Sequence, residues 1–188
     1  MDGIIEAFKI DSVGGLIAQL VGFVPLIISF FTFLLSKRGS IIVSKLISDL
    51  LWAFHFLLLG EFVGCIINFV NAIRDFVFFH KDKKWASHIS VPIIFGVLTV
   101  GAAFVRWQGW YSILPMLGSL LALIGFWCSN PRHIKKFNLP ATALWLIYGI
   151  IVGSISTVLC NLFSIISIII SETRDFIQKR KNQVQQDK

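Results

Sequence analysis

An internal repeat at a fixed spacing is the feature of this sequence that most constrains its fold. Residues 51–75 return 93 positions later as residues 144–168, and the two copies align without a gap. Each copy carries a Trp followed sixteen residues later by an Asn, namely Trp52 and Asn68 in the first copy and Trp145 and Asn161 in the second. Self-similarity of this kind predicts two copies of one structural unit.

The composition indicates that these units cross a membrane. Hydrophobic residues make up 56% of the 188 residues and charged residues only 14%, and the mean hydropathy is +0.80. A soluble domain of this size has too little interior to bury so much apolar surface. Long apolar segments separated by short basic or glycine-containing loops are typical of membrane-spanning helices. The sequence therefore predicts an all-α polytopic membrane protein surrounded by lipid.

The apolar segments predict seven spans in a three-plus-one-plus-three order. They lie at residues 13–35, 46–59, 62–79, 89–105, 111–128, 139–152 and about 154–170. We divide the chain into an N-terminal segment 1–12, a three-helix unit 13–84, a linker helix 85–109, a second three-helix unit 110–171 and a tail 172–188. Successive three-helix units need an extra crossing to enter the membrane in the same direction. We therefore expect parallel repeats related about the membrane normal.

The distribution of basic residues predicts the orientation of the spans. With the N-terminus outside, 15 of the 17 Lys and Arg residues lie on the cytoplasmic side, leaving Lys9 and Arg106 outside. Cytoplasmic loops carry such an excess, so we expect the N-terminus outside and the C-terminus in the cytoplasm. The net charge of +7 then follows from topology. No basic stripe interleaved with aromatic residues indicates a nucleic-acid partner. Acidic residues precede the first span, so no cleavable signal peptide is expected.

Four short segments resemble the YgjV-type family of bacterial inner-membrane proteins. They are residues 18–22 (Ala-Gln-Leu-Val-Gly), 55–60 (His-Phe-Leu-Leu-Leu-Gly), 71–74 (Asn-Ala-Ile-Arg) and 114–118 (Leu-Pro-Met-Leu-Gly). This resemblance covers nearly the whole chain after the first dozen residues. It implies an inner-membrane location.

A Trp on the second helix and an Asn on the third helix of each unit resemble the SWEET and PQ-loop transporter superfamily. This resemblance implies that Trp52, Asn68, Trp145 and Asn161 face a central cavity and bracket a sugar-like solute. The Pro-Gln pair of PQ-loop proteins is replaced here by residues 25–26 (Pro-Leu) and 115–116 (Pro-Met). The contacts made by that Gln are therefore not implied.

The residue types at these positions suit a polar solute. An Asn amide both donates and accepts hydrogen bonds, and a Trp supplies a flat apolar wall with one N–H donor. Further candidate binding residues are His55 with its repeat partner Tyr148, and Asn71 with its partner Ser164. Two interpretations of these polar positions stay open. They line a pore, or they form a polar seam of interhelical hydrogen bonds, each worth about 1–2 kcal/mol at best.

Two ionisable residues fall inside predicted spans. Asp49 and His55 are candidates for a proton-linked role, because ionisable residues in spans often mark ion or proton paths. The alternative for Asp49 is a pair with Lys45 at the interface. The alternative for His55 is a neutral imidazole that forms a hydrogen bond with a neighbouring helix.

The first helix of each predicted unit contains a Gly and a Pro one turn apart. These residues are Gly22 and Pro25 in the first unit, and Pro115 and Gly118 in the second. Because proline removes a backbone donor, both helices are candidate hinges. The alternative is a static kink that fixes helix packing.

We therefore predict a SWEET-like transporter that moves a small polar solute, sugar-like or another metabolite, by alternating access. One chain holds both units, so a monomer suffices for a cavity, and an oligomer stays open. The alternative is a non-transporting membrane protein, such as a sensor or assembly partner. We expect no enzyme, cofactor or metal, because G-x-S-x-G, H-E-x-x-H and paired intramembrane acids are missing from the sequence. The three cysteines lie in apolar segments without C-x-x-C spacing, and we expect them to pack.

Overall fold

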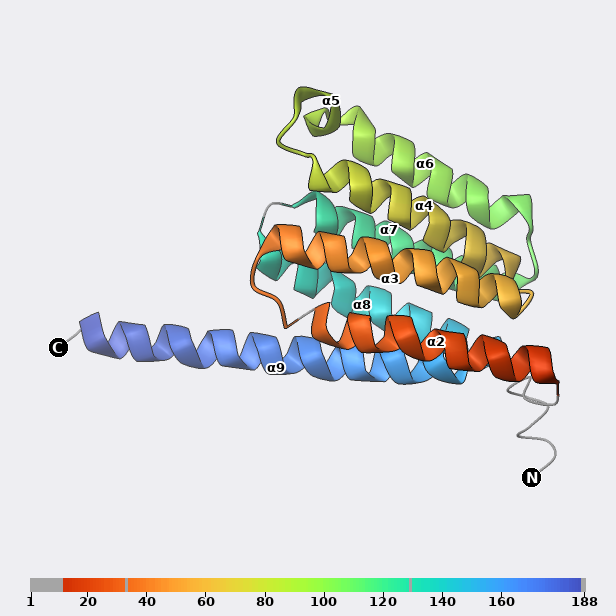
Figure 1. Cartoon of the computed structure of the whole chain (residues 1–188). Helices are drawn as coiled ribbons and strands as arrows, with labels where there is room; N and C mark the ends of the chain where they lie inside the picture. The colour runs from red at the N-terminus through yellow and green to blue at the C-terminus, as the bar shows by residue number, and fades with distance from the viewer. Residues whose placement is uncertain (1–11, 33, 129, 187–188) are drawn as a thin grey trace.

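Six helices follow one another around a closed ring in the computed structural model, which describes residues 12–32, 34–128 and 130–186. The ring consists of α2 (Val13–Thr32), α3 (Arg38–Leu58), α4 (Phe62–Phe79), α7 (Ile113–Trp127), α8 (Pro131–Ile151) and α9 (Ile155–Gln186). Each helix packs against the next in this order, and α9 packs against α2. Helix α6 (Ser90–Val105) lies outside the ring against α4 and α7 (Figure 1). A short α5 (Lys84–Ser87) and the 3₁₀ helix η1 (Trp110–Ser112) complete the described elements.

The two halves of the ring make equivalent contacts. In the first half α2 packs on α3 and α3 on α4, while in the second half α7 packs on α8 and α8 on α9. The halves meet through α2 with α9 and through α7 with α4. If the two halves are exchanged, the same set of helix–helix contacts results. This pattern is expected of two copies of one unit that face each other.

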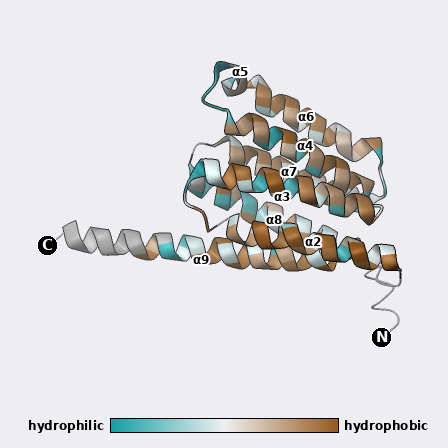
Figure 2. Ribbon diagram, viewed as in Figure 1, coloured by the Kyte–Doolittle hydropathy of each residue, from teal (hydrophilic) through white to brown (hydrophobic). Residues whose placement is uncertain are grey.

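Five of the described helices are long and apolar enough to cross a membrane. They are Val13–Thr32, Arg38–Leu58, Phe62–Phe79, Trp110–Trp127 and Ile155–Arg174. Helix α6 has 16 residues, and α8 carries four basic or histidine side chains in its first two turns. Hydrophobic residues dominate the helices, and hydrophilic residues gather in the connections between them (Figure 2). The chain is thus an all-α protein with several candidate spans, while the seven-span arrangement stays a prediction.

Helices α3 and α8 begin about two turns earlier than predicted. The basic segments that were expected to form loops before these helices are instead their first turns. The side chain of Asn130 accepts a hydrogen bond from the backbone N–H of Arg132 at 3.0 Å, and Pro131 occupies the first turn of α8. Both are favoured at helix starts. In α3, Arg38 donates to the carbonyl oxygens of Phe78 and Phe126 at 3.1 and 3.3 Å. These carbonyls belong to the last turns of α4 and α7, where helical partners are missing.

Other boundaries also differ from the prediction. Helix α2 ends at Thr32 rather than near residue 35, and α5 was not predicted. Helix α9 continues without a break from the predicted seventh span into the tail, as far as Gln186, and it projects beyond the rest of the bundle (Figure 1). Within the predicted basic loop before the sixth span, Lys135 is buried and donates to the hydroxyl of Ser171 in α9. The predicted N-terminal segment 1–12 lies almost wholly outside the described residues.

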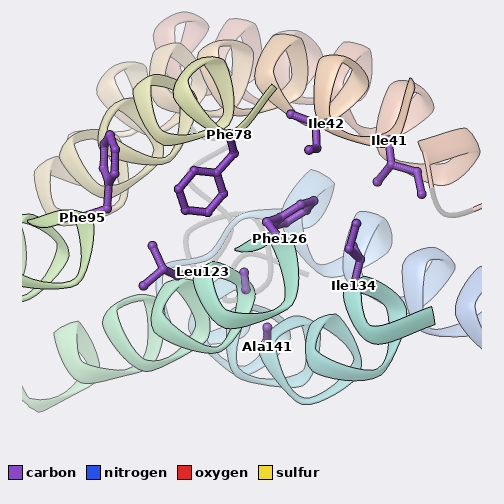
Figure 3. Packing of buried hydrophobic residues seen from close by; sticks show 9 residues of the cluster. Ile41, Ile42, Phe78, Phe95, Leu123, Phe126, Ile134 and Ala141 are labelled. Carbon is purple, nitrogen blue, oxygen red and sulfur yellow. The ribbon is translucent and has the colours of Figure 1, made fainter. Parts of the chain in front are cut away.

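Two of the three buried clusters among the described residues lie at different levels of the ring. The first, which we call the Ile41 cluster, contains Ile41, Ile42, Phe78, Phe95, Ala122, Leu123, Phe126, Ile134 and Ala141 (Figure 3). The second, the Phe56 cluster, contains Ala18, Leu26, Trp52, Phe56, Leu59, Tyr148, Val152 and Cys160. Ile41 and Ile134 are repeat partners, and both are fully buried in the same cluster. The two halves therefore pack against each other through equivalent residues.

Candidate functional site

A polar cavity of about 70 Å³ lies inside the ring. All six ring helices contribute to its lining, which consists of Ser29, Lys45, Asp49, Trp52, Phe56, Asn68, Asn71, Ser119, Ala122, Asn138, Ala141, Thr142, Trp145, Thr157, Cys160, Asn161 and Ser164. Ala122 and Ala141 also belong to the Ile41 cluster, whereas Trp52, Phe56 and Cys160 belong to the Phe56 cluster. The cavity is therefore a polar chamber between two apolar layers.

Six of the eight predicted binding residues line this one chamber. They are Trp52, Asn68, Asn71, Trp145, Asn161 and Ser164. The other two predicted residues, His55 and Tyr148, are fully buried but do not line it. Whether the six bind a solute stays a prediction.

The lining follows the sequence repeat closely. At the 93-residue offset, six pairs of lining residues are repeat partners: Ser29 and Ala122, Lys45 and Asn138, Asp49 and Thr142, Trp52 and Trp145, Asn68 and Asn161, Asn71 and Ser164. The cavity thus lies where the two halves converge. Sequence reasoning missed Asn138 and Thr142, although the offset could have found them as partners of Lys45 and Asp49. It also missed Ser119 and Phe56, whose repeat positions hold Leu26 and Gly149 and gave no signal.

Three asparagines on the cavity have the same amide orientation. The Nδ2 atoms of Asn68, Asn138 and Asn161 each donate to the carbonyl oxygen four residues earlier, at 2.8 Å in every case. A carbonyl oxygen only accepts, so the nitrogen of each amide must be the atom that faces it. Each amide then keeps its oxygen and its second N–H for other partners. These residues can therefore offer acceptors to the cavity as well as one donor each.

Aromatic rings form one wall of the cavity. The Phe56 ring lies 6.0 Å from that of Trp52 and 5.9 Å from that of Trp145, centroid to centroid. Tyr148 packs behind them, 5.7 Å from Phe56 and from Trp145. Aromatic pairs at these separations stabilise each other beyond their buried area. Tyr148 is therefore a support of the aromatic wall, not part of the cavity surface.

A buried charged network lies beside the cavity. Arg74 donates to Asp75 Oδ1 at 2.8 Å and to Asn71 Oδ1 at 3.0 Å. Lys45 donates to Asp49 Oδ1 at 2.5 Å. Arg74, Asp49 and Asp75 are all at most 1% exposed. Two cations and two carboxylates balance, which lowers the cost of burying charge.

Two sequence interpretations change as a result. Arg74 was assigned to the basic residues of the cytoplasmic side, but it is buried because Asp75 and Asn71 hold its guanidinium inside the bundle. Asp49 forms the ion pair with Lys45 that was considered as its alternative role. It also lines the cavity, so a proton-linked role stays a prediction.

His55 joins the two halves instead of facing the cavity. Its Nδ1 lies 2.7 Å from the carbonyl oxygen of Ala18, and its Nε2 lies 2.8 Å from the hydroxyl of Ser154. Because the carbonyl only accepts, Nδ1 carries a proton, and Nε2 can accept from the Ser156 hydroxyl at 3.3 Å, so the neutral imidazole is satisfied. Ser154 in turn donates to the hydroxyl of Thr157 at 2.6 Å, and Thr157 lines the cavity. His55 thus lies behind the cavity surface, in contact with the lining rings of Trp52 and Phe56.

The glycines predicted as hinge residues lie at close helix contacts. A Cβ atom on Gly22 would lie 2.0 Å from Ser156 Oγ and 2.8 Å from His55 Cε1. A Cβ atom on Gly118 would lie 2.9 Å from Trp145 Cδ1. Both positions therefore require glycine for packing. This need is independent of any hinge role, which stays a prediction.

The two prolines are not equivalent. Pro25 lies inside α2, whereas Pro115 is the third residue of α7. A proline in the first turn of a helix removes no interior hydrogen bond. The predicted weakening of the backbone thus applies to α2 more than to α7.

Each of the two helical hairpins is bound by a glutamine from another part of the chain. Gln19 donates to the Gly153 carbonyl at 2.9 Å and accepts from the Ile155 N–H at 3.1 Å. Gln108 accepts from the Val63 N–H at 3.2 Å and lies 3.4 Å from the Gly60 carbonyl. Gly60 and Gly153 are repeat partners, with φ of 76° and 71°. The glutamines themselves are not partners, so the offset gave no signal for this pair of contacts.

The comparisons with known proteins place the chain in a family. The model of the Imp-YgjV family, described as a bacterial inner membrane protein, matches residues 16–179. The chain therefore belongs to this family, as its sequence segments indicated. Inner membrane protein YgjV of Escherichia coli (strain K12) is 24% identical over 139 residues, which are 74% of this chain and 73% of that protein.

A second relative carries the name of an enzyme. Undecaprenyl-diphosphatase of Halothermothrix orenii is 24% identical over 152 residues, which are 79% of this chain and 55% of that protein. The chain thus spans little more than half of that relative. No solved structure matches the chain. These comparisons do not show kinship with SWEET or PQ-loop transporters, so that resemblance stays a prediction.

Proposed function

We propose that this member of the bacterial inner membrane protein family Imp-YgjV moves a small polar solute across the membrane by alternating access. The observation that carries the proposal is the convergence of six pairs of repeat-equivalent residues on one polar cavity inside the ring. A bundle with a purely structural role has no need of such a chamber, because buried polar groups without partners are costly. A site at the interface of two repeats is typical of transporters built from internal repeats.

The transporter proposed here has seven spans, arranged as two parallel three-helix units joined by α6. The self-consistent contacts of the two halves support this arrangement. Helix α2 begins and α9 ends at opposite ends of the bundle, as an odd number of crossings requires (Figure 1). The basic first turns of α3 and α8 then lie at the cytoplasmic end, with the N-terminus outside.

Thiol labelling tests this orientation. Arg106 and Lys83 are exposed at connections on opposite sides of the proposed membrane. A cysteine-free protein carrying Arg106→Cys should react with a membrane-impermeant maleimide added to intact spheroplasts. The Lys83→Cys protein should react only after lysis. The opposite labelling pattern would contradict the proposed orientation.

The small volume of the cavity limits the size of the solute that it can hold in this conformation. One ordered water needs about 10–15 Å³ of such volume, so about 70 Å³ suits a small solute or a few waters. Pockets for drug-sized ligands reach about 300–1,000 Å³, so a larger solute would require the two apolar layers to separate.

A flux assay tests transport directly. Proteoliposomes are mixed with hyperosmotic solutions of polyols, sugars, amino acids or amine salts, and reswelling is followed by light scattering in a stopped-flow instrument. We expect at least one small polar solute to enter faster than in protein-free liposomes. The double variant N68L/N161L should lose this flux. The matched control F69L/L162F changes the neighbouring repeat partners, which are 53% and 42% exposed on the outer surface, and should retain it.

The same assay decides between transport and the other function classes. Absence of flux for every solute, with intact protein, would favour a non-transporting membrane protein. The diphosphatase name of one relative raises a third class. Hydrolysis of a diphosphate needs cations that are free to bind it, but Lys45 and Arg74 are paired with carboxylates. We therefore expect no phosphate release from undecaprenyl diphosphate.

A further inference from the structure

Several polar atoms of the cavity lining are hydrogen-bond acceptors. The amide nitrogens of Asn68, Asn138 and Asn161 each use one of their two N–H groups on a helix carbonyl, and the amide oxygens point away from those carbonyls. The hydroxyl of Thr142 donates its proton to the Asn138 carbonyl at 2.6 Å, so this hydroxyl offers only lone pairs. A ligand that binds to these oxygens must supply donors.

Asp49 adds a charged acceptor to the same cavity. Its side chain is buried and lines the chamber. Oδ1 accepts from Lys45, whereas Oδ2 has no hydrogen-bond partner in the described part of the chain. The Arg74 guanidinium lies 3.8 Å from Oδ2, beyond hydrogen-bond distance. A buried carboxylate oxygen without a donor is costly, and a bound donor would remove that cost.

The cations near the cavity are already engaged. Lys45 is held by Asp49 Oδ1, and Arg74 is held by Asp75 and Asn71. The four charges of this network balance. The net charge of the network therefore does not favour an anion, whereas a cationic ligand can supply the donor that Asp49 Oδ2 lacks.

The aromatic wall favours the same ligand charge. Trp52, Phe56 and Trp145 line the cavity. Aromatic faces attract cations, and Trp attracts them most strongly. A small ammonium group combines positive charge with up to three N–H donors, so it matches both the acceptor atoms and the aromatic wall.

We propose that the cavity binds a small protonated primary amine, which donates to Asp49 Oδ2 and to the amide oxygens of Asn68 and Asn161 beside the Trp52 and Trp145 rings. This inference rests on the function proposed above, because it names the chemical class of the transported solute. Its test is binding, which does not depend on flux.

The binding test uses full-length protein in lipid nanodiscs at neutral pH. Thermal unfolding is measured with ethylammonium chloride, ethylene glycol, sodium acetate or sodium chloride at matched concentration and ionic strength. We expect a rise in the unfolding temperature with ethylammonium that saturates with concentration, and none with the other three probes. Equal stabilisation by ethylene glycol, by acetate or by sodium chloride alone would overturn the proposal. Failure of ethylammonium to stabilise the protein would overturn it as well.

Variants locate the binding. Asp49→Asn should weaken ethylammonium binding at least tenfold. Asn161→Leu removes one acceptor and leaves Thr157 in its helical hydrogen bond, so it should fold even if the Asp49 variant does not, and binding should weaken severalfold. Leu162→Phe, on the exposed side of α9, is the matched control and should bind as the unchanged protein does. Unaltered binding in the Asn161 variant would place the amine elsewhere and overturn the proposal.

Flux separates the two proposals. If ethylammonium binds in the cavity but no solute crosses proteoliposomes, the transport function fails and amine recognition stands. If polyols or sugars cross and ethylammonium does not bind, amine recognition fails and transport stands.

Discussion

The two halves of this protein share a framework but differ in charge. Both halves place a Trp and an Asn on the cavity, and both close with a glycine hairpin at equivalent positions. The first half adds Lys45, Asp49, Arg74 and Asp75, whereas the second half holds Asn138, Thr142, Ser167 and Ile168 at those positions. The packing of the ring thus requires the two halves to match in shape but not in charge. In the amine site proposed above, the carboxylate comes from the first half alone.

The largest expected effect comes from breaking the charged network of the first half. Arg74→Met leaves Asp75 without its cation inside the bundle, and removing one partner of a buried ion pair costs about 3–5 kcal/mol. Chemical unfolding of the protein in nanodiscs measures this loss of stability.

The second half supplies the matched control. The double variant R74S/D75I introduces the residues of its partner positions, Ser167 and Ile168, which are buried without charge in α9. Removing both charges together should recover most of the lost stability, because no buried carboxylate is then left alone. If R74M unfolds no more easily than the unchanged protein, the network has no structural role.

Packing glycines provide the second comparison. Gly22→Ala places a methyl group against Ser156 and His55 where the halves meet, and overpacking of this kind costs about 1–3 kcal/mol. The Gly101→Ala control lies on α6, where nothing lies within 4 Å of the added atom. That change should stabilise the protein by up to about 1 kcal/mol. Thermal unfolding measures both, and equal effects would contradict a packing role for Gly22.

The glutamine contacts sharpen the comparison of the two hairpins. Gln19 is buried and makes the shorter hydrogen bonds, so Gln19→Leu should cost about 1–2 kcal/mol, while Gln108→Leu should cost less. Hydrogen exchange is the direct measurement. The Ile155 amide should exchange faster in the Gln19 variant, and the Val63 amide in the Gln108 variant. Faster exchange at both amides in either variant would show that the hairpins are not held separately.

The prolines are expected to give the smallest effect on stability. Because Pro25 interrupts α2 while Pro115 lies in the first turn of α7, Pro115→Ala should change stability by less than about 0.5 kcal/mol. Pro25→Ala restores an interior donor and should slow solute flux more than Pro115→Ala does, with binding retained. Equal flux in both variants and in the unchanged protein would remove the hinge and leave a static kink.

The sequence alone determined the features that depend on local pattern and repetition. The apolar segments predicted helices, and α4 has the predicted bounds. The resemblance of the repeated Trp and Asn to SWEET and PQ-loop transporters implied that Trp52, Asn68, Trp145 and Asn161 would face one cavity, and they line one cavity. These features follow from hydrophobic periodicity and from the equivalence of two copies, both of which can be read along the chain.

Tertiary structure decided the features that depend on neighbours distant in sequence. From its place near the end of a span, Arg74 was expected among the basic residues of the cytoplasmic side. Asn71, Asp75 and the Phe126 ring hold it inside the bundle instead. From its spacing to Trp52, His55 was expected to line the cavity. Ser154 of the other half binds it at the contact between the halves instead. Burial of a polar group depends on which partners satisfy its hydrogen bonds. Those partners are set by how the two halves pack and not by the residue's own position in the repeat.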